Sequence, residues 1–217
     1  MDIKFCGLTR AEDAAYAAAL GARYVGVIFA ESPRQLDDER ARQVFDVVPL
    51  GVSRVGVFGD VKPEQIAARA EKLGLDVVQL HGDPKPRIIA RLRKKWQGRI
   101  WAVQRVEGAE IPVSASDLFD AADAIVLDSR VPDKLGGTGV VLPWDELRDR
   151  VAAIRTPRTR LVLAGGLTAE NVAIAIESLQ PDVVDVSSGV ELMPGIKDHD
   201  KMRAFRDAVV ATVDVSR

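Results

Sequence analysis

Short apolar runs alternate with segments of helical apolar spacing along the whole chain. Several of the runs are apolar almost throughout, which is typical of strands buried on both faces of a sheet. The runs predicted as strands are Ile3–Cys6, Tyr24–Phe29, Val52–Phe58, Asp76–Leu80, Arg99–Gln104, Ala124–Asp128, Arg160–Ala164 and Val183–Val186.

A helix is expected after each of these strands. Thr9 and Glu12 form a capping-box pattern that would open the first helix, and Gly21 follows its end. The predicted helices are Ala11–Leu20, Leu36–Val48, Pro63–Leu73, Pro84–Trp96, Ser114–Ala121, Trp144–Ile154, Ala169–Leu179 and Asp198–Val213.

Eight successive strand–helix units predict an α/β protein, a single-domain (β/α)8 TIM barrel with a parallel eight-stranded barrel. The 217 residues are near the lower end for that fold, and the domain is expected to span residues 1–217. No linker, low-complexity stretch or change of composition suggests a second domain. The alternation alone also allows an open doubly wound sheet.

Composition and net charge limit the kinds of binding partner that we expect for this protein. Hydrophobic residues make up 47% of the chain and charged residues 29%, as in ordinary globular proteins. A net charge of −2 argues against nucleic acid or an anionic membrane as the main partner. One cysteine allows no intrachain disulfide, and two histidines spell out no metal cluster. With neither a signal-peptide pattern nor a membrane-spanning run, we expect a cytoplasmic protein, a monomer or homodimer with a small-molecule substrate and no bound metal.

The loops after the seventh and eighth strands carry the clearest chemical signal. In (β/α)8 barrels these two loops usually form a phosphate site. Gly165 and Gly166 let the backbone approach an anion without interference from Cβ atoms, and Ser187, Ser188 and Gly189 add hydroxyl and N–H donors. The alternative is that these glycines only form turns.

Cys6 and Asp128 end the first and sixth strands and form a candidate acid–base pair. Nearby positive charge can lower the pKa of a thiol, and apolar surroundings can raise that of a carboxyl group. A thiolate base and a protonated acid could together move a proton between neighbouring carbons. Alternatively, Cys6 is a buried structural cysteine, and Asp128 is an ion-pair partner or a helix cap.

Other polar residues follow strand ends with less specific signals. Arg34 could hold a carboxylate bidentately or form a solvent-facing ion pair, while Gln79 and His81 close the fourth strand. The glycine-rich residues 136–139 lack nucleotide-loop spacing and are interpreted as a mobile loop over the site. The basic run 91–95 is interpreted as a solvated helix face.

The ordered set of motifs resembles the phosphoribosylanthranilate isomerase family of tryptophan biosynthesis, over nearly the whole chain. The matching segments are Lys4-Phe5-Cys6-Gly7-Leu8-Thr9, Ser32-Pro33-Arg34, Val77-Val78-Gln79-Leu80-His81-Gly82, Leu127-Asp128-Ser129, Gly136-Gly137-Thr138-Gly139, Leu163-Ala164-Gly165-Gly166-Leu167, Glu170-Asn171-Val172, Asp185-Val186-Ser187-Ser188-Gly189-Val190-Glu191 and Gly195-Ile196-Lys197-Asp198.

This resemblance implies a (β/α)8 barrel that catalyses an Amadori rearrangement of N-(5′-phosphoribosyl)anthranilate without a cofactor. It implies that Cys6 removes the C2′ proton and that Asp128 protonates the ring oxygen. Arg34, with Gln79 and His81, would line the anthranilate side, with Arg34 facing the carboxylate. The glycine and serine loops would hold the phosphate.

The sequence departs from the family pattern in three places. Val140-Val141 stands where Phe-Asp is usual, Gly59-Asp60 where Val-Asn is commoner, and Thr168-Ala169 where a proline often occurs. None of these departures removes a proposed catalytic group. The first bears on loop closure.

Other phosphate-binding barrels are the nearest alternatives. The related histidine-pathway isomerase typically pairs two aspartates, whereas Cys6 ends the first strand here. Indole-glycerol phosphate synthase would need lysine and glutamate at strand ends. A bifunctional isomerase would need a second phosphate-binding half, and the first-half loops contain no glycine pair. A non-catalytic binding barrel would keep the phosphate loops without turnover.

Overall fold

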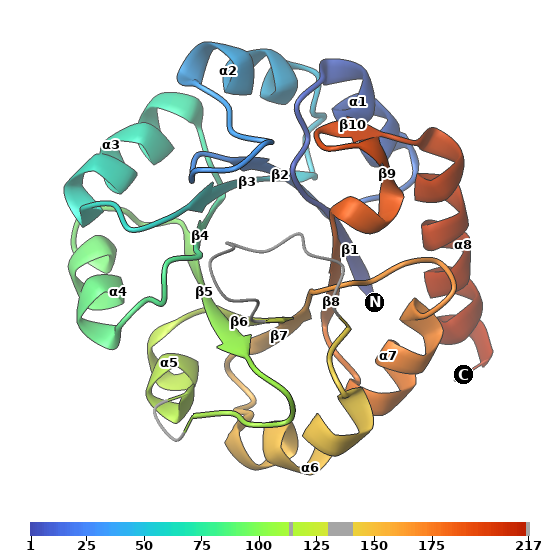
Figure 1. Cartoon of the computed structure of the whole chain (residues 1–217). Helices are drawn as coiled ribbons and strands as arrows, with labels where there is room; N and C mark the ends of the chain where they lie inside the picture. The colour runs from blue at the N-terminus through green and yellow to red at the C-terminus, as the bar shows by residue number, and fades with distance from the viewer. Residues whose placement is uncertain (113–114, 130–140, 216–217) are drawn as a thin grey trace.

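Eight parallel strands form a closed barrel, in sequence order, in the computed structural model, which describes residues 1–112, 115–129 and 141–215 (Figure 1). The barrel closes where β1 pairs with β8, with Phe5 opposite Val186. The closed barrel confirms the predicted fold and excludes the open sheet. The strands are β1 (Asp2–Phe5), β2 (Tyr24–Ile28), β3 (Ser53–Phe58), β4 (Val77–Leu80), β5 (Arg99–Val106), β6 (Ala124–Ser129), β7 (Arg160–Leu163) and β8 (Val183–Val186).

Helices surround the barrel on its outside (Figure 1). They cover the outward strand side chains and form the larger hydrophobic cluster with them. The helices are α1 (Ala11–Ala19), α2 (Asp38–Asp46), α3 (Pro63–Leu73), α4 (Pro86–Arg93), α5 (Ala115–Ala121), α6 (Trp144–Ile154), α7 (Val172–Leu179) and α8 (His199–Val215).

A second, smaller cluster fills the interior of the barrel. Side chains two residues apart along a strand point the same way, so alternate residues of each strand enter this interior. Trp101 packs edge-on against Tyr24, with ring centroids 4.8 Å apart. The members of this cluster are Tyr24, Val55, Val77, Trp101, Val103, Ala124, Val126, Val162, Ala164 and Val183.

Helix α1 begins at Ala11 as predicted, but its cap differs from the prediction. Arg10, not Thr9, occupies the N-cap position, and within the described chain its side chain makes no cap hydrogen bond. The Thr9 hydroxyl instead donates to the carbonyl of Gly195, far along the sequence. The expected capping box is therefore wrong, because a tertiary partner takes the hydroxyl that the local motif would use.

Several helices begin later than predicted, and polar side chains explain the starts of α2 and α7. The side chain of Asp37 accepts a hydrogen bond from the backbone of Arg40 and so caps α2. Before α7, Asn171 accepts from the Thr168 backbone N–H and donates to the Gly166 carbonyl, holding a turn where a helix was expected. In both places a polar side chain satisfies the backbone and fixes the helix start.

A short excursion after β8 was not predicted. It contains a 3₁₀ turn η1 (Ser188–Val190) and an antiparallel pair, β9 (Glu191–Met193) and β10 (Ile196–Lys197). Figure 1 shows this pair near α1, on the barrel end that faces the viewer.

Three sequence expectations concern surface segments. In α4, Arg91 forms an ion pair with Glu64 and both side chains are exposed, as expected of a solvated basic face. Residues 136–139, interpreted as a loop over the site, lie outside the described residues. Among the described helices, none has both the length and the apolar character needed to cross a bilayer.

Candidate active site

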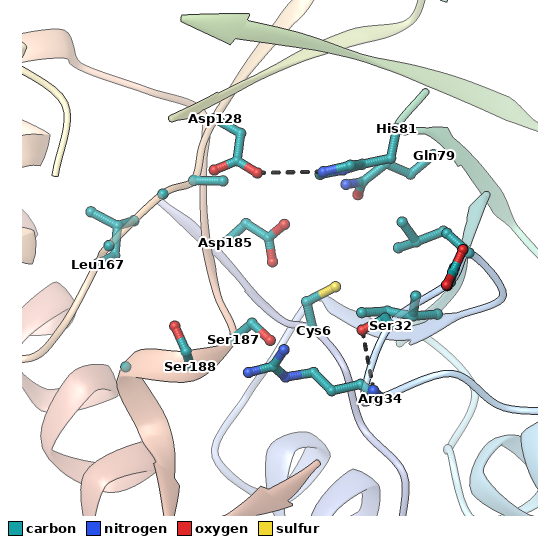
Figure 2. A pocket seen from close by; sticks show the side chains of 18 residues that line it. Cys6, Ser32, Arg34, Gln79, His81, Asp128, Leu167, Asp185, Ser187 and Ser188 are labelled. Carbon is teal, nitrogen blue, oxygen red and sulfur yellow. Dashed lines mark hydrogen bonds and ion pairs between the residues drawn. The ribbon is translucent and has the colours of Figure 1, made fainter. Parts of the chain in front are cut away.

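All the residues predicted for the site line one pocket at the carboxyl end of the barrel (Figure 2). They come from the ends of β1, β4 and β6 and from the loops after β2, β7 and β8. The predicted residues in this pocket are Cys6, Arg34, Gln79, His81, Asp128, Gly165, Gly166, Ser187, Ser188 and Gly189.

The strand alternation explains why these side chains meet. Asp128 is two residues after Val126, which belongs to the interior cluster, so its side chain also points inward. The pairing of β6 with β5 and β7 then fixes its height at the top of the barrel. Figure 2 shows Asp128 and Cys6 extending into the pocket from different strands, with Asp185 between them in this view.

Cys6 is buried, and burial raises the pKa of its thiol above the ordinary value. Lys4 and, more weakly, Lys197 act in the opposite direction, while the negative charge of Asp185 adds to the rise. The sequence left the net shift of this pKa open, and in the structure desolvation of the thiolate outweighs the two lysines. Gly26 provides space for the thiol, since a Cβ there would lie 3.0 Å from Sγ.

Asp128 is the candidate acid, and its surroundings favour the protonated carboxyl group. Burial raises the pKa of its carboxyl group to about 7, and the charge of Asp185 adds to this effect. A carboxyl group with this pKa can hold a proton near neutral pH and release it to a substrate. The apolar strand that precedes it suggested this shift, which the structure bears out in direction.

His81 faces Asp128, with Nε2 and Oδ2 3.6 Å apart. Burial lowers the pKa of the imidazole to about 4, and the charge of Arg105 lowers it further. Between about pH 4 and 7 the two groups therefore form a neutral acid–imidazole pair rather than an ion pair. Neither ring nitrogen of His81, nor Oε1 of Gln79, has a hydrogen-bond partner among the described residues. These buried polar atoms are available to a ligand.

A buried ion pair lies directly beside the thiol and was not predicted. Lys4 Nζ contacts Asp185 Oδ2 at 2.7 Å, and the two side chains are 0% and 6% exposed. Asp185 lines the pocket. The sequence signal was present, because each is a charged residue between two apolar neighbours in its strand. Charged residues are almost never fully buried unless they are paired. A lysine in the first strand and an aspartate in the last strand could therefore have been predicted to pair where the barrel closes.

Arg34 is also buried, and the carboxylate that it holds is one of the chain's own. Its Nε and Nη2 donate to the two oxygens of Glu191 at 2.8 and 2.7 Å. Burial would raise the pKa of Glu191, but Arg34 and Lys197 outweigh it and keep that pKa low. The solvent-facing ion pair that the sequence left open is therefore not what forms. The bidentate geometry is as expected, and the partner in β9 was missed because the excursion itself was missed.

Two glycine-containing loops form the far wall of the pocket. Gly165 and Gly166 both have positive φ angles, +84° and +65°, a region that side chains other than glycine rarely adopt. A Cβ on Gly189 would lie 1.9 Å from the carbonyl oxygen of Leu167, so only glycine allows the two loops to approach this closely. The glycines thus do more than form turns, because they bring backbone donors of β7 and β8 to one place.

No group of three or more potential metal-ligating side chains occurs among the described residues. The fold and the pocket together define a (β/α)8-barrel protein with the carboxyl group of Asp128 and the thiol of Cys6 beside two donor-rich loops. In this fold the loops after β7 and β8 commonly bind phosphate.

Comparison with known proteins agrees with this class. The sequence model of the family described as N-(5′-phosphoribosyl)anthranilate (PRA) isomerase matches residues 3–208. A protein of Acidithiobacillus ferrooxidans named N-(5′-phosphoribosyl)anthranilate isomerase is 44% identical over 204 residues, covering 94% of each chain.

Solved structures give the same result. Phosphoribosyl anthranilate isomerase from Thermotoga maritima superposes with a TM-score of 0.87 at 32% identity, covering 97% of this chain and 99% of that one. A second structure, with the same identity and coverage and a TM-score of 0.84, is this isomerase in complex with reduced 1-(o-carboxyphenylamino)-1-deoxyribulose 5-phosphate. The chain belongs to the N-(5′-phosphoribosyl)anthranilate isomerase family, and it is an isomerase of tryptophan biosynthesis.

Proposed function

We propose that Cys6 and Asp128 are the base and the acid with which this chain converts N-(5′-phosphoribosyl)anthranilate into 1-(2-carboxyphenylamino)-1-deoxyribulose 5-phosphate. The observation that supports this most directly is their position in one pocket, next to the two glycine-containing loops. General acid–base catalysis needs only two such groups and no cofactor.

The two groups perform the first two proton transfers of the reaction. The Asp128 carboxyl group gives its proton to the furanose ring oxygen, the C1′–O bond breaks, and the nitrogen lone pair forms a Schiff base. The Cys6 thiolate then removes the proton at C2′, and the C–H electron pair forms an enolamine. Protonation at C1′ and loss of the enol proton give the ketose. The raised pKa of Asp128 supports the first transfer, since the group can be protonated near pH 7.

The remaining pocket residues would hold the two ends of the substrate. Gly165, Gly166, Ser187, Ser188 and Gly189 would bind the 5′-phosphate through backbone N–H groups and hydroxyls, which suits an anion. Arg34 would direct its remaining nitrogen, Nη1, at the anthranilate carboxylate while Glu191 fixes the other two. Gln79 and His81 would supply hydrogen bonds on the anthranilate side.

Two broader properties are also part of this proposal. We expect the enzyme to act in the cytoplasm, where a single buried cysteine stays reduced and a phosphorylated substrate is retained. We expect a monomer or a homodimer.

The test is a coupled assay of the reaction itself. N-(5′-phosphoribosyl)anthranilate is generated in situ from anthranilate and phosphoribosyl pyrophosphate with a purified transferase, and its fluorescence decay is followed after addition of this protein. Fast decay with the parent, and a loss of at least ~100-fold in Cys6→Ala and in Asp128→Ala, is the expected result. Cys6→Ser and Asp128→Asn serve as variants of matched size.

The outcomes separate substrate from residues. Absence of decay with the parent protein would refute the reaction, and the histidine-pathway ribonucleotide would then be tried. Turnover that survives one substitution would keep the reaction and remove that residue from its role.

A further inference from the structure

The buried Lys4–Asp185 ion pair adjoins the pocket, and Figure 2 shows Asp185 between the two proposed catalytic groups in that view. Lys4 is two residues before Cys6 on β1 and is paired in register with Asp185 on β8. A Cβ on Gly26 would lie 3.0 Å from Cys6 Sγ and 3.2 Å from Lys4 Cε, so the ammonium stem and the thiol converge on one point. Lys4 is fully buried and does not line the pocket, whereas Asp185 does.

The two carboxylate oxygens of Asp185 differ in their hydrogen bonding. Asp185 Oδ2 accepts from Lys4, but Oδ1 is buried without a hydrogen-bond partner among the described residues. The charge of Lys4 also acts on Cys6, whose sulfur lies near the Lys4 side chain beside Gly26. A buried ion pair costs desolvation free energy and is often replaceable by apolar residues, so its presence here calls for another role.

The charges around the two catalytic groups are few. Cys6 faces Lys4 on its own strand, Asp185 on β8, Lys197 on β10 and Arg34 from the loop after β2. The charged groups facing Asp128 are Asp185 on β8, Lys4 on β1 and Arg105 on β5. The neutral imidazole of His81, which follows β4, also faces Asp128. Of the charged groups named here from the described residues, Lys4 and Asp185 act on both Cys6 and Asp128.

We propose that the Lys4–Asp185 pair is the positioning device that separates the two roles, with its ammonium stabilising the Cys6 thiolate and its carboxylate keeping Asp128 protonated. This inference rests on the proposed function. Lys4 raises the thiolate population as the largest opposing charge to burial, and Asp185 is the largest charge that favours protonated Asp128. One buried dipole thus acts on two acids in opposite senses.

The order of the two pKa values determines what fraction of the protein has a Cys6 thiolate together with a protonated Asp128. Burial places the pKa of the Cys6 thiol above its ordinary value, while that of Asp128 is about 7. The form with a thiolate and a protonated carboxyl group is therefore a minor tautomer of the singly protonated pair. Its share falls about tenfold for each unit by which the two pKa values move apart. The pair acts to keep them close.

The test uses the single cysteine of the chain. Thiolate absorbance at 240 nm is titrated in the parent, in Lys4→Met and in Lys4→Met/Asp185→Asn, with Cys6→Ser as the blank. Lys4→Met leaves a buried carboxylate unpaired and can cost about 3–5 kcal/mol of stability, whereas the double variant leaves no such charge. Circular dichroism verifies the fold of each variant. Asp2→Asn is the matched control, because it removes another charge from β1 at the opposite end of the barrel.

The expected result is an upward shift of the thiol pKa, by about one unit or more in Lys4→Met and by less in the double variant, because Asp185 itself raises the pKa of Cys6. In the pH profile of kcat/KM, the double variant should show its acidic limb at lower pH and its basic limb at higher pH. The maximum should fall about tenfold for each unit of broadening. Asp2→Asn should match the parent in the thiol titration and in the profile.

An unchanged thiol titration in a folded double variant would overturn the proposal, and so would lost activity without broadening of the profile. The thiol titration needs no substrate. If the parent fails to turn over N-(5′-phosphoribosyl)anthranilate, the proposed function fails, while the titration still decides whether the pair acts on Cys6.

Discussion

The two ends of the barrel interior are built from the same strands and differ in almost every other respect. At the amino end, Trp101, Val103 and Val126 belong to an apolar cluster that excludes water. Polar groups at that rim are satisfied, as where Arg160 donates to Tyr24 and to Asp2. Two residues further along the strands, the interior becomes polar, and several buried atoms have no described partner.

The difference shows which end of the barrel interior stabilises the fold and which end lowers its stability. Apolar burial below contributes roughly 25 cal/mol for each Å² removed from water. Above, each unpaired buried polar atom costs about 1–3 kcal/mol until a ligand satisfies it. The polar carboxyl end of the barrel interior, here the upper layer, is thus suited to bind a ligand. The apolar cluster at the amino end, here the lower layer, stabilises the barrel beneath it.

The largest effect should come from the lower layer. Trp101→Ala removes a buried indole and is expected to cost about 3–5 kcal/mol of unfolding free energy, measured by urea denaturation. Below its melting temperature the variant should keep kcat/KM within about threefold of the parent, because Trp101 does not line the pocket. Trp101→Phe should lose less stability. Activity that falls in proportion to stability in both variants would show that the layers are not separable.

An intermediate effect of opposite sign is expected in the upper layer. The folded-state pKa of Asp128 is raised from 3.8 to about 7, so the folded protein holds a proton that the unfolded chain releases. The contribution of Asp128 to the free energy of unfolding therefore falls as pH rises from about 4 to about 7, while the lowered pKa of His81 acts in the opposite direction between about pH 4 and its ordinary value of 6.5. Asp128→Asn should abolish this loss, making the variant more stable than the parent at pH 8 by on the order of a few kcal/mol while activity drops ~100-fold.

Urea denaturation at pH 4 and pH 8 measures the stability difference. Exposed Asp149→Asn is the control, and its difference from the parent should stay small at both pH values. Equal pH dependence in Asp128→Asn and the parent would mean that the carboxyl group is not held protonated by the fold.

The smallest effect concerns the loops that rim the upper layer. Gly189→Ala places a Cβ against the Leu167 carbonyl and should cost about 1–3 kcal/mol, with KM raised about tenfold as the β7 and β8 loops move apart. Gly51→Ala is the matched control, with φ of +95° and no described atom within 4 Å of the added Cβ. It should lose about 1 kcal/mol through backbone strain and leave KM unchanged. A KM unchanged in Gly189→Ala would argue against a ligand site between these loops.

The sequence predicted the elements well where local signals were unopposed. Trp144–Ile154 and Val183–Val186 have the predicted bounds, because their apolar spacing is clear and nothing distant competes for their ends. The prediction for α1 was wrong at Thr9, whose hydroxyl bonds to Gly195. The hairpin of β9 and β10 was missed because its strands are too short to show a period.

The candidate site was located from the sequence by a general rule, that active sites of this fold lie at the carboxyl ends of strands. Cys6 and Asp128 follow from that rule. Lys4 and Asp185 do not, because Lys4 is buried without lining the pocket and because the pairing of the two depends on which strands adjoin at the closure of the barrel.

By itself, the sequence determined the order of strands and helices, the strand ends that carry polar groups and the family, since periodicity and motif order are local and cumulative properties. Only the tertiary structure decided which charges meet and what they do to the acid and the base. The pKa of Cys6 is the clearest case, because burial raises it against the neighbouring lysines. Desolvation depends on everything that surrounds a group, and no stretch of sequence contains that surrounding.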